Sequence, residues 1–376
     1  MVFNFIGLIL LLFVAAEFLM RLIKFLRTGK WEIFAFKRES EEKKHAAYQA
    51  HTYIGYTKSK NVTNPQFPSN SDCFAGSKDI SMIRTKGFNT VRIVVCGGST
   101  VEQNDLDKVS DFDPELTWPK IMENTLNKVD KEKIYEVMNA GCAGYTILES
   151  TIHFLTKCVP YKPDYAILYT GINDAWCIQT LADFKPDYTH ARRPPIFPSN
   201  KNIFQFFPNI RLSFVYQYTL FYLSKWFEKS SSLMSYISNH SKFKMTSKQI
   251  PTAVKTYEGY LKSFCGIALA NGIIPILVPW LFDRESVRQP PFMSDWDQKK
   301  FIELLKMNNE VTRLIAKKTN GATLLELPFI GKEGFRLSNQ TIQQAGLGWI
   351  HFSKVGLIKM GENAAHEFLK CHKSQV

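Results

Sequence analysis

Short apolar runs, several rich in β-branched residues, recur along the C-terminal three quarters of the chain. They lie at residues 91–96, 135–138, 165–169, 273–278 and, more weakly, 322–325. Continuous apolar runs are typical of strands that are buried on both faces of a parallel sheet, whereas half-exposed strands alternate apolar and polar residues. We therefore expect about five buried strands.

Helical patterns fill the intervals between these runs. They cover residues 118–129, 148–156, 254–271, 299–319 and 355–371. Strands that alternate with helices indicate an α/β fold, a doubly wound parallel sheet with helices on both faces. In such folds the ligand binds outside the carboxyl ends of the strands, so functional residues should directly follow strands.

The N-terminus carries a different pattern. Residues 2–20 are apolar except for Asn4 and Glu17. As a helix this stretch is roughly 28 Å long, close to the thickness of a bilayer core. Glu17 precedes Arg21 by four residues, which favours an ion pair on one helix face. No basic residue precedes the run, which argues against a cleaved signal peptide. We predict a single-pass transmembrane anchor over residues 1–22, with the membrane as a partner.

Charge follows the apolar segment. The chain has 47 Lys and Arg against 34 Asp and Glu, a net charge of +13. Much of the excess lies between residues 21 and 44, which favours an anionic membrane surface. No nucleic-acid-binding motif accompanies the charge, so we expect no nucleic-acid partner. We predict a basic juxtamembrane linker and N-terminal extension over 23–88, and a catalytic domain over 89–376 with an aromatic helical insertion near 184–249.

Cysteine and histidine spacing argues against a metal site. The seven cysteines form no CxxC motif, and the eight histidines lack ligand spacing. A disulfide framework or a zinc site is therefore not expected. We predict neither a metal nor another cofactor.

Four short segments carry the candidate chemistry. They are Gly97-Gly98-Ser99-Thr100 after the first strand, residues 139–146 after the second, Gly171-Ile172-Asn173-Asp174 after the third, and residues 348–356 before the last helix. Each alone has a simpler interpretation: a tight turn or phosphate-binding loop, a flexible loop, a helix cap and a structural histidine. No Gly-x-Gly-x-x-Gly or Walker lysine supports nucleotide binding.

Together and in this order, the four segments resemble the SGNH/GDSL hydrolases. The Ser, Gly, Asn and His of that family's four blocks fall on Ser99, Gly144, Asn173 and His351. The resemblance covers roughly residues 85–370, and the N-terminal part is similar to a bacterial membrane-anchored subgroup. It implies a flavodoxin-like sheet and ester or acyl substrates, often sugar O-acetyl groups. It also implies a domain outside the cytoplasm, whereas the flanking charge favours the cytoplasmic side; both sides stay open.

The residue chemistry agrees with this resemblance. A serine hydroxyl becomes a nucleophile when a neighbouring base takes its proton, and histidine does so near neutral pH. We expect Ser99 to be the nucleophile and His351 its base. The backbone N–H groups of Ser99 and Gly144 and the amide of Asn173 would form the oxyanion hole, the set of donors that stabilises the negatively charged intermediate.

One position departs from the family pattern. The family's Asp three residues before the histidine is Gly348 here. That carboxylate normally orients the imidazole. Three explanations stay open: a Ser–His dyad, a carboxylate from elsewhere with Asp283 and Glu285 as candidates, or an impaired enzyme. Asp174 is expected to be structural. The function is accordingly ester hydrolysis, acyl transfer to a sugar hydroxyl, or binding without catalysis.

Overall fold

A computed structural model of the chain describes its residues in separate stretches. These are residues 2–29, 31, 47–62, 68–76, 86–103, 116–178, 184–192, 213, 215, 219, 250–285, 287, 298–335 and 348–373. The chain divides into two compact units, Met1–Lys44 with Pro194–Tyr236, and His45–Arg193 with Ile237–Val376. Most of the predicted insertion near 184–249 lies outside the described residues.

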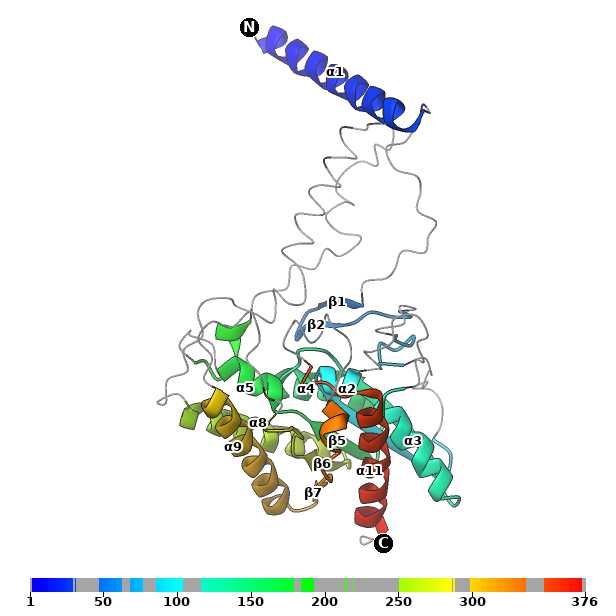
Figure 1. Cartoon of the computed structure of the whole chain (residues 1–376), viewed down its shortest axis with the longest axis vertical. Coiled ribbons are helices and arrows are strands. Elements are labelled where there is room, and N and C mark those ends of the chain that lie inside the picture. Colours follow the sequence, from blue (N-terminus) through cyan, green and yellow to red (C-terminus); the bar gives the residue numbers. More distant parts are fainter. Residues whose placement is uncertain are drawn as a thin grey trace. The chain divides into compact units, whose positions relative to one another are not determined.

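The first unit contains the helix α1 (Val2–Thr28), which appears at the N-terminus in Figure 1. The predicted ion pair is present, with 2.9 Å between Arg21 Nη2 and Glu17 Oε1. The Ser213 hydroxyl also donates to Glu17, at 2.9 Å.

The prediction of a transmembrane anchor over residues 1–22 is not supported. Among the residues that the structure describes, no helix is both long enough and apolar enough to cross a membrane. The helix does not end with the apolar segment, because it continues past Arg21 through Lys24 and Arg27 to Thr28. Its second half is therefore polar on part of its surface.

The second unit is built on a parallel five-stranded sheet. The strands are β3 (Thr90–Gly97), β4 (Ile134–Gly141), β5 (Tyr165–Tyr169), β6 (Ile274–Val278) and β7 (Thr323–Leu324). Their order across the sheet is β4-β3-β5-β6-β7, and every neighbouring pair is parallel. This is the flavodoxin-like order, in which the chain reverses its direction of travel beside the first strand. The predicted α/β fold class is thus confirmed for the sheet.

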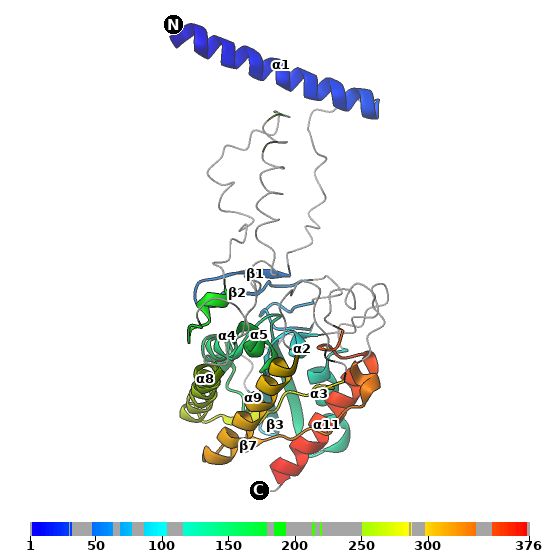
Figure 2. The same ribbon diagram turned by 60° about the vertical axis from the view of Figure 1, so that its left-hand side comes forward.

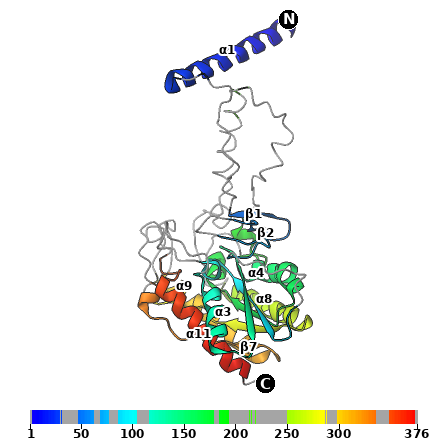
Figure 3. The ribbon, with the colours of Figure 1, turned by 90° about the vertical axis from the view of Figure 1, so that its right-hand side faces the viewer.

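Helices cover both faces of this sheet, as Figures 1 and 3 show. Among the described residues, the α-helices of this unit are α2 (Ser99–Glu102), α3 (Trp118–Val129), α4 (Ile147–His153), α5 (Ile172–Ile178), α8 (Ile250–Ala270), α9 (Gln298–Lys318) and α11 (Lys354–Lys373). A π-helix follows α4 at Phe154–Cys158, and 3-10 helices lie at Val159–Tyr161, Thr189–Ala191 and Lys332–Phe335.

Two hydrophobic clusters lie on the two faces of β3. Ile93 and Val95 belong to the cluster that contains α3 and α11 residues. Val94 and Cys96 belong to the other, which contains α4 and α8 residues. Successive side chains of a strand point to opposite faces, so the unbroken apolar run of β3 serves both clusters.

An antiparallel hairpin precedes the sheet. Its strands are β1 (Tyr48–His51) and β2 (Gly55–Lys58), which lie next to each other in Figure 2. Residues 51–57 form the end of β1, a turn and most of β2. The hairpin belongs to the same compact unit as the sheet.

Candidate active site

The sharp turn after β3 places Ser99 at the carboxyl edge of the sheet. Gly97 ends the strand and Gly98 precedes α2, which begins at Ser99. A Cβ added at Gly97 would lie 2.3 Å from the Tyr169 carbonyl oxygen, and one at Gly98 would lie 2.5 Å from Asn173 Nδ2. Both glycines are thus required by space, since parts of β5 and α5 pack directly on them.

His351 reaches Ser99 from the other end of the chain. Its Nε2 lies 3.0 Å from the Ser99 Oγ, which is hydrogen-bond distance for a base and its nucleophile. The following residue, Phe352, is fully buried, and Trp349 and Ile350 before it are buried too. The structure therefore brings these two predicted residues together although they are 252 positions apart.

A serine at the start of α11 holds the histidine segment at its C-terminal side. Ser353 Oγ donates to the Glu333 carbonyl at 2.7 Å and accepts from the Gly356 N–H at 3.2 Å. The second bond satisfies one of the backbone donors that every helix leaves unpaired in its first turn. A Cβ at Gly356 would lie 2.1 Å from the Gly334 carbonyl oxygen, so α11 begins in close contact with the preceding 3-10 helix.

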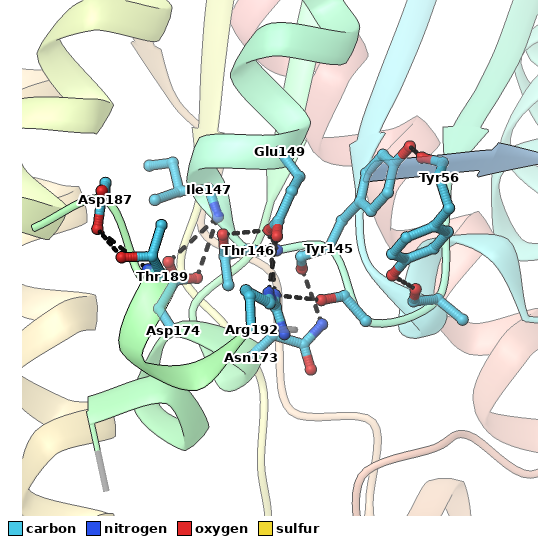
Figure 4. A network of polar contacts seen from close by, with 12 residues as sticks. Tyr56, Tyr145, Thr146, Ile147, Glu149, Asn173, Asp174, Asp187, Thr189 and Arg192 are labelled. Atoms are coloured by element: carbon cyan, nitrogen blue, oxygen red, sulfur yellow. Dashed lines mark hydrogen bonds and ion pairs between the residues drawn. The ribbon is translucent and has the colours of Figure 1, made fainter. Parts of the chain in front are cut away.

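The loop after β4 brings Gly144 close to Asn173. Asn173, in the first turn of α5, donates from Nδ2 to the Tyr145 carbonyl at 2.8 Å. Gly144 has a φ of +80°, a conformation that other residues rarely adopt. Its carbonyl accepts a hydrogen bond from Arg192 Nη2 at 2.8 Å. Figure 4 shows Asn173 and Arg192 against this loop.

A buried ion pair between Arg192 and Glu149 holds the same loop. Arg192 Nε lies 2.8 Å from Glu149 Oε1, and both side chains are less than a tenth exposed. Burial raises the pKa of the Glu149 carboxyl, but the Arg192 charge and the hydrogen bonds from Arg192 and Thr146 together outweigh burial and lower this pKa. Glu149 also accepts the Thr146 N–H at 2.7 Å, which closes a capping box at the start of α4.

A second buried ion pair, between Lys58 and Glu102, joins the hairpin to the nucleophile helix. Their side chains are 2% and 4% exposed. Glu102 also accepts the Tyr48 hydroxyl at 2.9 Å and the Ala143 N–H at 2.5 Å. Burial and the Glu102 charge raise the pKa of Tyr48 well above its usual value, so Tyr48 donates.

Hydrogen bonds between tyrosines and backbone carbonyls extend this contact. The Tyr56 hydroxyl donates to the Ala143 carbonyl, and the Tyr145 hydroxyl donates to the Tyr56 carbonyl at 2.6 Å. The β1–β2 hairpin thus supports the loop that carries Gly144. Sequence analysis did not identify this role of the hairpin, and it also missed Glu102 and Arg192.

Asp174 has the structural surroundings expected of it. Its carboxylate accepts the Ile147 N–H at 3.1 Å and the Thr170 hydroxyl at 3.1 Å. Burial raises its pKa to about 6, and these two hydrogen bonds oppose the rise. Asp174 therefore ties α5 to the first turn of α4.

The two carboxylates considered as substitutes for the missing family Asp lie in different surroundings. Glu285 pairs with Lys332 on the surface, where its side chain is 75% exposed. Asp283 is buried and accepts the Glu285 N–H at 3.2 Å. Gly348 itself is half-buried in a turn.

All cysteines of the chain lie among the described residues. All seven cysteines are free thiols, and six of them are buried. Within the described stretches no group of three or more His, Cys, Asp or Glu side chains is arranged to hold a metal ion.

The comparisons with known proteins give similar solved structures only. No protein-family model and no curated protein sequence matches the chain. A protein from Desulfitobacterium hafniense, described as lipolytic and of the G-D-S-L family, is 16% identical; the match covers 74% of this chain and 99% of that one, with a TM-score of 0.40.

Two further solved structures are similar to the same extent. A lipase/acylhydrolase from Enterococcus faecalis is 16% identical, with 75% of this chain and 96% of that one covered and a TM-score of 0.40. The acetylxylan esterase Axe2 from Geobacillus stearothermophilus is 15% identical, with 77% and 95% covered and a TM-score of 0.37. Similarity at this level does not identify the reaction, which has to come from the geometry of the site itself.

Proposed function

We propose that this chain is a serine hydrolase of carboxylic esters, with Ser99 as nucleophile and His351 as general base. The observation that carries the proposal is the 3.0 Å separation between Ser99 Oγ and His351 Nε2 at the carboxyl edge of the sheet. Ligands of doubly wound folds bind at this edge. A serine beside an imidazole there is suited to attack an acyl carbon.

The reaction begins with transfer of the Ser99 proton to His351 Nε2. Ser99 Oγ then forms a bond to the acyl carbon, and the carbonyl electron pair moves onto its oxygen. When the intermediate collapses, His351 returns the proton to the departing alcohol oxygen. Water repeats the sequence on the acyl-enzyme, releases the acid and restores Ser99.

Three donors are suited to stabilise the negative oxygen. The N–H of Ser99 lies in the first turn of α2, where helices leave backbone donors without an intrahelical partner. The Asn173 amide adjoins it, since a Cβ added at Gly98 would lie 2.5 Å from Asn173 Nδ2. The N–H of Gly144 belongs to the loop that this amide contacts, because Asn173 Nδ2 donates to the carbonyl of the next residue, Tyr145. Loss of one such donor typically costs about 10²–10³-fold in rate.

The buried ion pairs Lys58–Glu102 and Arg192–Glu149 support this assignment. Both hold the loop after β4 that carries Gly144, here called the donor loop. Glu102 binds the Ala143 N–H and Arg192 binds the Gly144 carbonyl, one residue apart. Fixed donors stabilise a developing charge better than mobile ones, because they need no reorganisation during the reaction. Within the ester class, the SGNH/GDSL resemblance makes sugar O-acetyl groups the first substrates to test.

Covalent labelling tests the proposal. A fluorophosphonate probe should label the wild-type protein at Ser99, with hydrolysis of p-nitrophenyl acetate lost in parallel. The Ser99→Ala variant should show neither labelling nor hydrolysis. Equal labelling of Ser99→Ala and wild type would refute the assignment. Addition of acetylated xylo-oligosaccharides, with and without a free sugar acceptor, then separates deacetylation from acyl transfer.

A further inference from the structure

Gln103 connects the nucleophile helix to the histidine segment. It directly follows α2 and is 4% exposed. Its Nε2 donates to the Phe352 carbonyl at 2.5 Å, and its Oε1 accepts the Phe352 N–H at 2.9 Å. One amide side chain thus makes hydrogen bonds with both backbone groups of the residue that follows His351.

These contacts connect Ser99 to His351 by a second route, in addition to their direct hydrogen bond. The Gln103 N–H donates to the Ser99 carbonyl at 2.8 Å, so the backbone of Gln103 is tied to the nucleophile. Its side chain is tied to Phe352, whose neighbour His351 contacts Ser99 Oγ. Two hydrogen bonds from a planar amide fix both the distance and the orientation of the peptide that they hold.

We propose that Gln103 is a positioning residue that keeps His351 Nε2 at hydrogen-bond distance from Ser99 Oγ. This inference rests on the proposed function, since it assumes that the Ser99–His351 contact is catalytic. Gly348 offers no side chain three residues before His351. The Gln103 amide supplies a fixed connection one residue after it. Displacement of a catalytic group by about 1 Å can reduce the rate about 10²-fold.

The described part of the chain contains two further amide–backbone pairs of the same kind, which serve as internal comparisons. Asn127 in α3 makes two 2.9 Å hydrogen bonds with the backbone of Tyr135 in β4. Asn309 in α9 holds the backbone of Trp280 at 2.8 and 2.9 Å. Of the three pairs, the Gln103 pair is the one that joins the element carrying Ser99 to the segment carrying His351.

Matched substitutions separate positioning from general stability. Gln103→Met and Asn127→Leu keep the approximate size of each side chain and remove the two hydrogen bonds to the partner backbone. Asn127→Leu also removes the hydrogen bond from Asn127 Nδ2 to the Glu123 carbonyl. Each should lower the melting temperature. Only Gln103→Met should lower kcat on p-nitrophenyl acetate, by about 10–100-fold with KM changed less than about threefold. Asn127→Leu should keep kcat within about twofold of wild type.

A pH profile gives a second readout that a purely structural role would not change. In Gln103→Glu, a protonated carboxyl both donates and accepts, as the amide does, whereas a carboxylate only accepts. The ratio of kcat/KM between Gln103→Glu and wild type should therefore rise as the pH falls. Wild type supplies the reference for this ratio, because it also contains His351 and the Lys58–Glu102 pair.

The outcomes distinguish this inference from the proposed function. Wild-type kcat in a folded Gln103→Met variant overturns the positioning role, and the assignment of Ser99 stands if Ser99→Ala is unlabelled. Labelling of Ser99→Ala overturns the proposed function first. If Gln103→Met does not fold, the Gln103→Glu ratio decides, and a ratio independent of pH contradicts the inference.

Discussion

The two halves of the site are held by different kinds of interaction. The donor half, around Gly144 and Asn173, rests on buried carboxylates: Glu102 and Glu149 each pair with a buried cation, and Asp174 binds a helix N-terminus. The histidine half is held by the Gln103 amide, the Ser353 hydroxyl and aromatic packing.

This difference matches what each half has to do. The donor half must keep backbone N–H groups fixed while a negative charge appears, and ion pairs on both sides of the loop restrain it. Under the proposed mechanism the histidine half must present an imidazole at one distance from Ser99, and Gln103 and Ser353 hold the backbone of this segment through neutral hydrogen bonds. The predictions below test the two halves separately.

The largest effect is expected from loss of the base itself. His351→Ala should reduce kcat by about 10³–10⁶-fold, because no group then removes the Ser99 proton. The measurement is p-nitrophenyl acetate hydrolysis beside Ser99→Ala, with melting temperatures to show that both variants fold. If His351→Ala retained a tenth or more of the wild-type kcat, another residue would have to be the base.

Loss of a cation under the donor half should mainly affect stability. Lys58→Met leaves Glu102 buried without its ion-pair partner and should cost about 3–5 kcal/mol in the free energy of unfolding. Urea denaturation measures this cost. The double variant Lys58→Met/Glu102→Gln should recover part of it, because no uncompensated charge then stays buried.

An exposed ion pair supplies the control for this experiment. Lys332 and Glu285 are 52% and 75% exposed at their side chains. Lys332→Met should therefore change the unfolding free energy by less than about 1 kcal/mol. If both lysine substitutions had the same small effect, the Lys58–Glu102 pair would not be a main support of the donor loop.

Removal of one donor should lower activity without a matching loss of substrate binding. Asn173→Ala should reduce kcat by about 10²–10³-fold. Asn173→Asp, which keeps the size but cannot donate when ionised, should be similarly impaired. A wild-type kcat in either variant would exclude the Asn173 amide from the oxyanion hole.

Most of the fold could be predicted from the sequence, because apolar runs and helical patterns are local features of the chain. The run at 165–169 coincides with β5, and the pattern at 118–129 coincides with α3. The helix expected at 148–156 instead changes to a π-helix at Phe154, a variation in hydrogen bonding that apolar spacing does not encode. The anchor predicted over residues 1–22 was not supported, since no helix in the described part of the chain is long and apolar enough to cross a membrane.

The residue pairs that hold the site in place could not be predicted from the sequence in the same way. Ser99, Asn173 and His351 lie in motifs, but Lys58–Glu102 and Gln103–Phe352 join residues 44 and 249 positions apart. Such pairs depend on the folded arrangement of the chain. The one available signal was the pair of polar residues Glu102 and Gln103 directly after the apolar Val101, and both are buried.

A smaller effect is expected from the titration of Asp174. Burial raises its pKa from 3.8 to about 6 in the folded chain, so the folded state favours the protonated form. Its contribution to stability is therefore fully present below pH 3.8 and is lost as the pH rises through about 6. The stability of Asp174→Asn relative to wild type should accordingly increase across this interval.

Chemical denaturation at several pH values measures this difference. Asp187→Asn is the control, because that carboxyl is largely exposed and its pKa is lowered by hydrogen bonds from Thr189. Its contribution changes in the opposite direction, being lost as the pH falls. A difference between Asp174→Asn and wild type that did not depend on pH would show that Asp174 does not change protonation in this range.

The smallest effect is expected where the family pattern would suggest a large one. If Gln103 already holds His351 beside Ser99, Gly348→Asp should change kcat by less than about tenfold, or ~1.4 kcal/mol. A gain of about 10³-fold or more would instead mean that wild-type His351 lacks an orienting group. The histidine half would then be incomplete, and the connection through Gln103 would not replace the carboxylate.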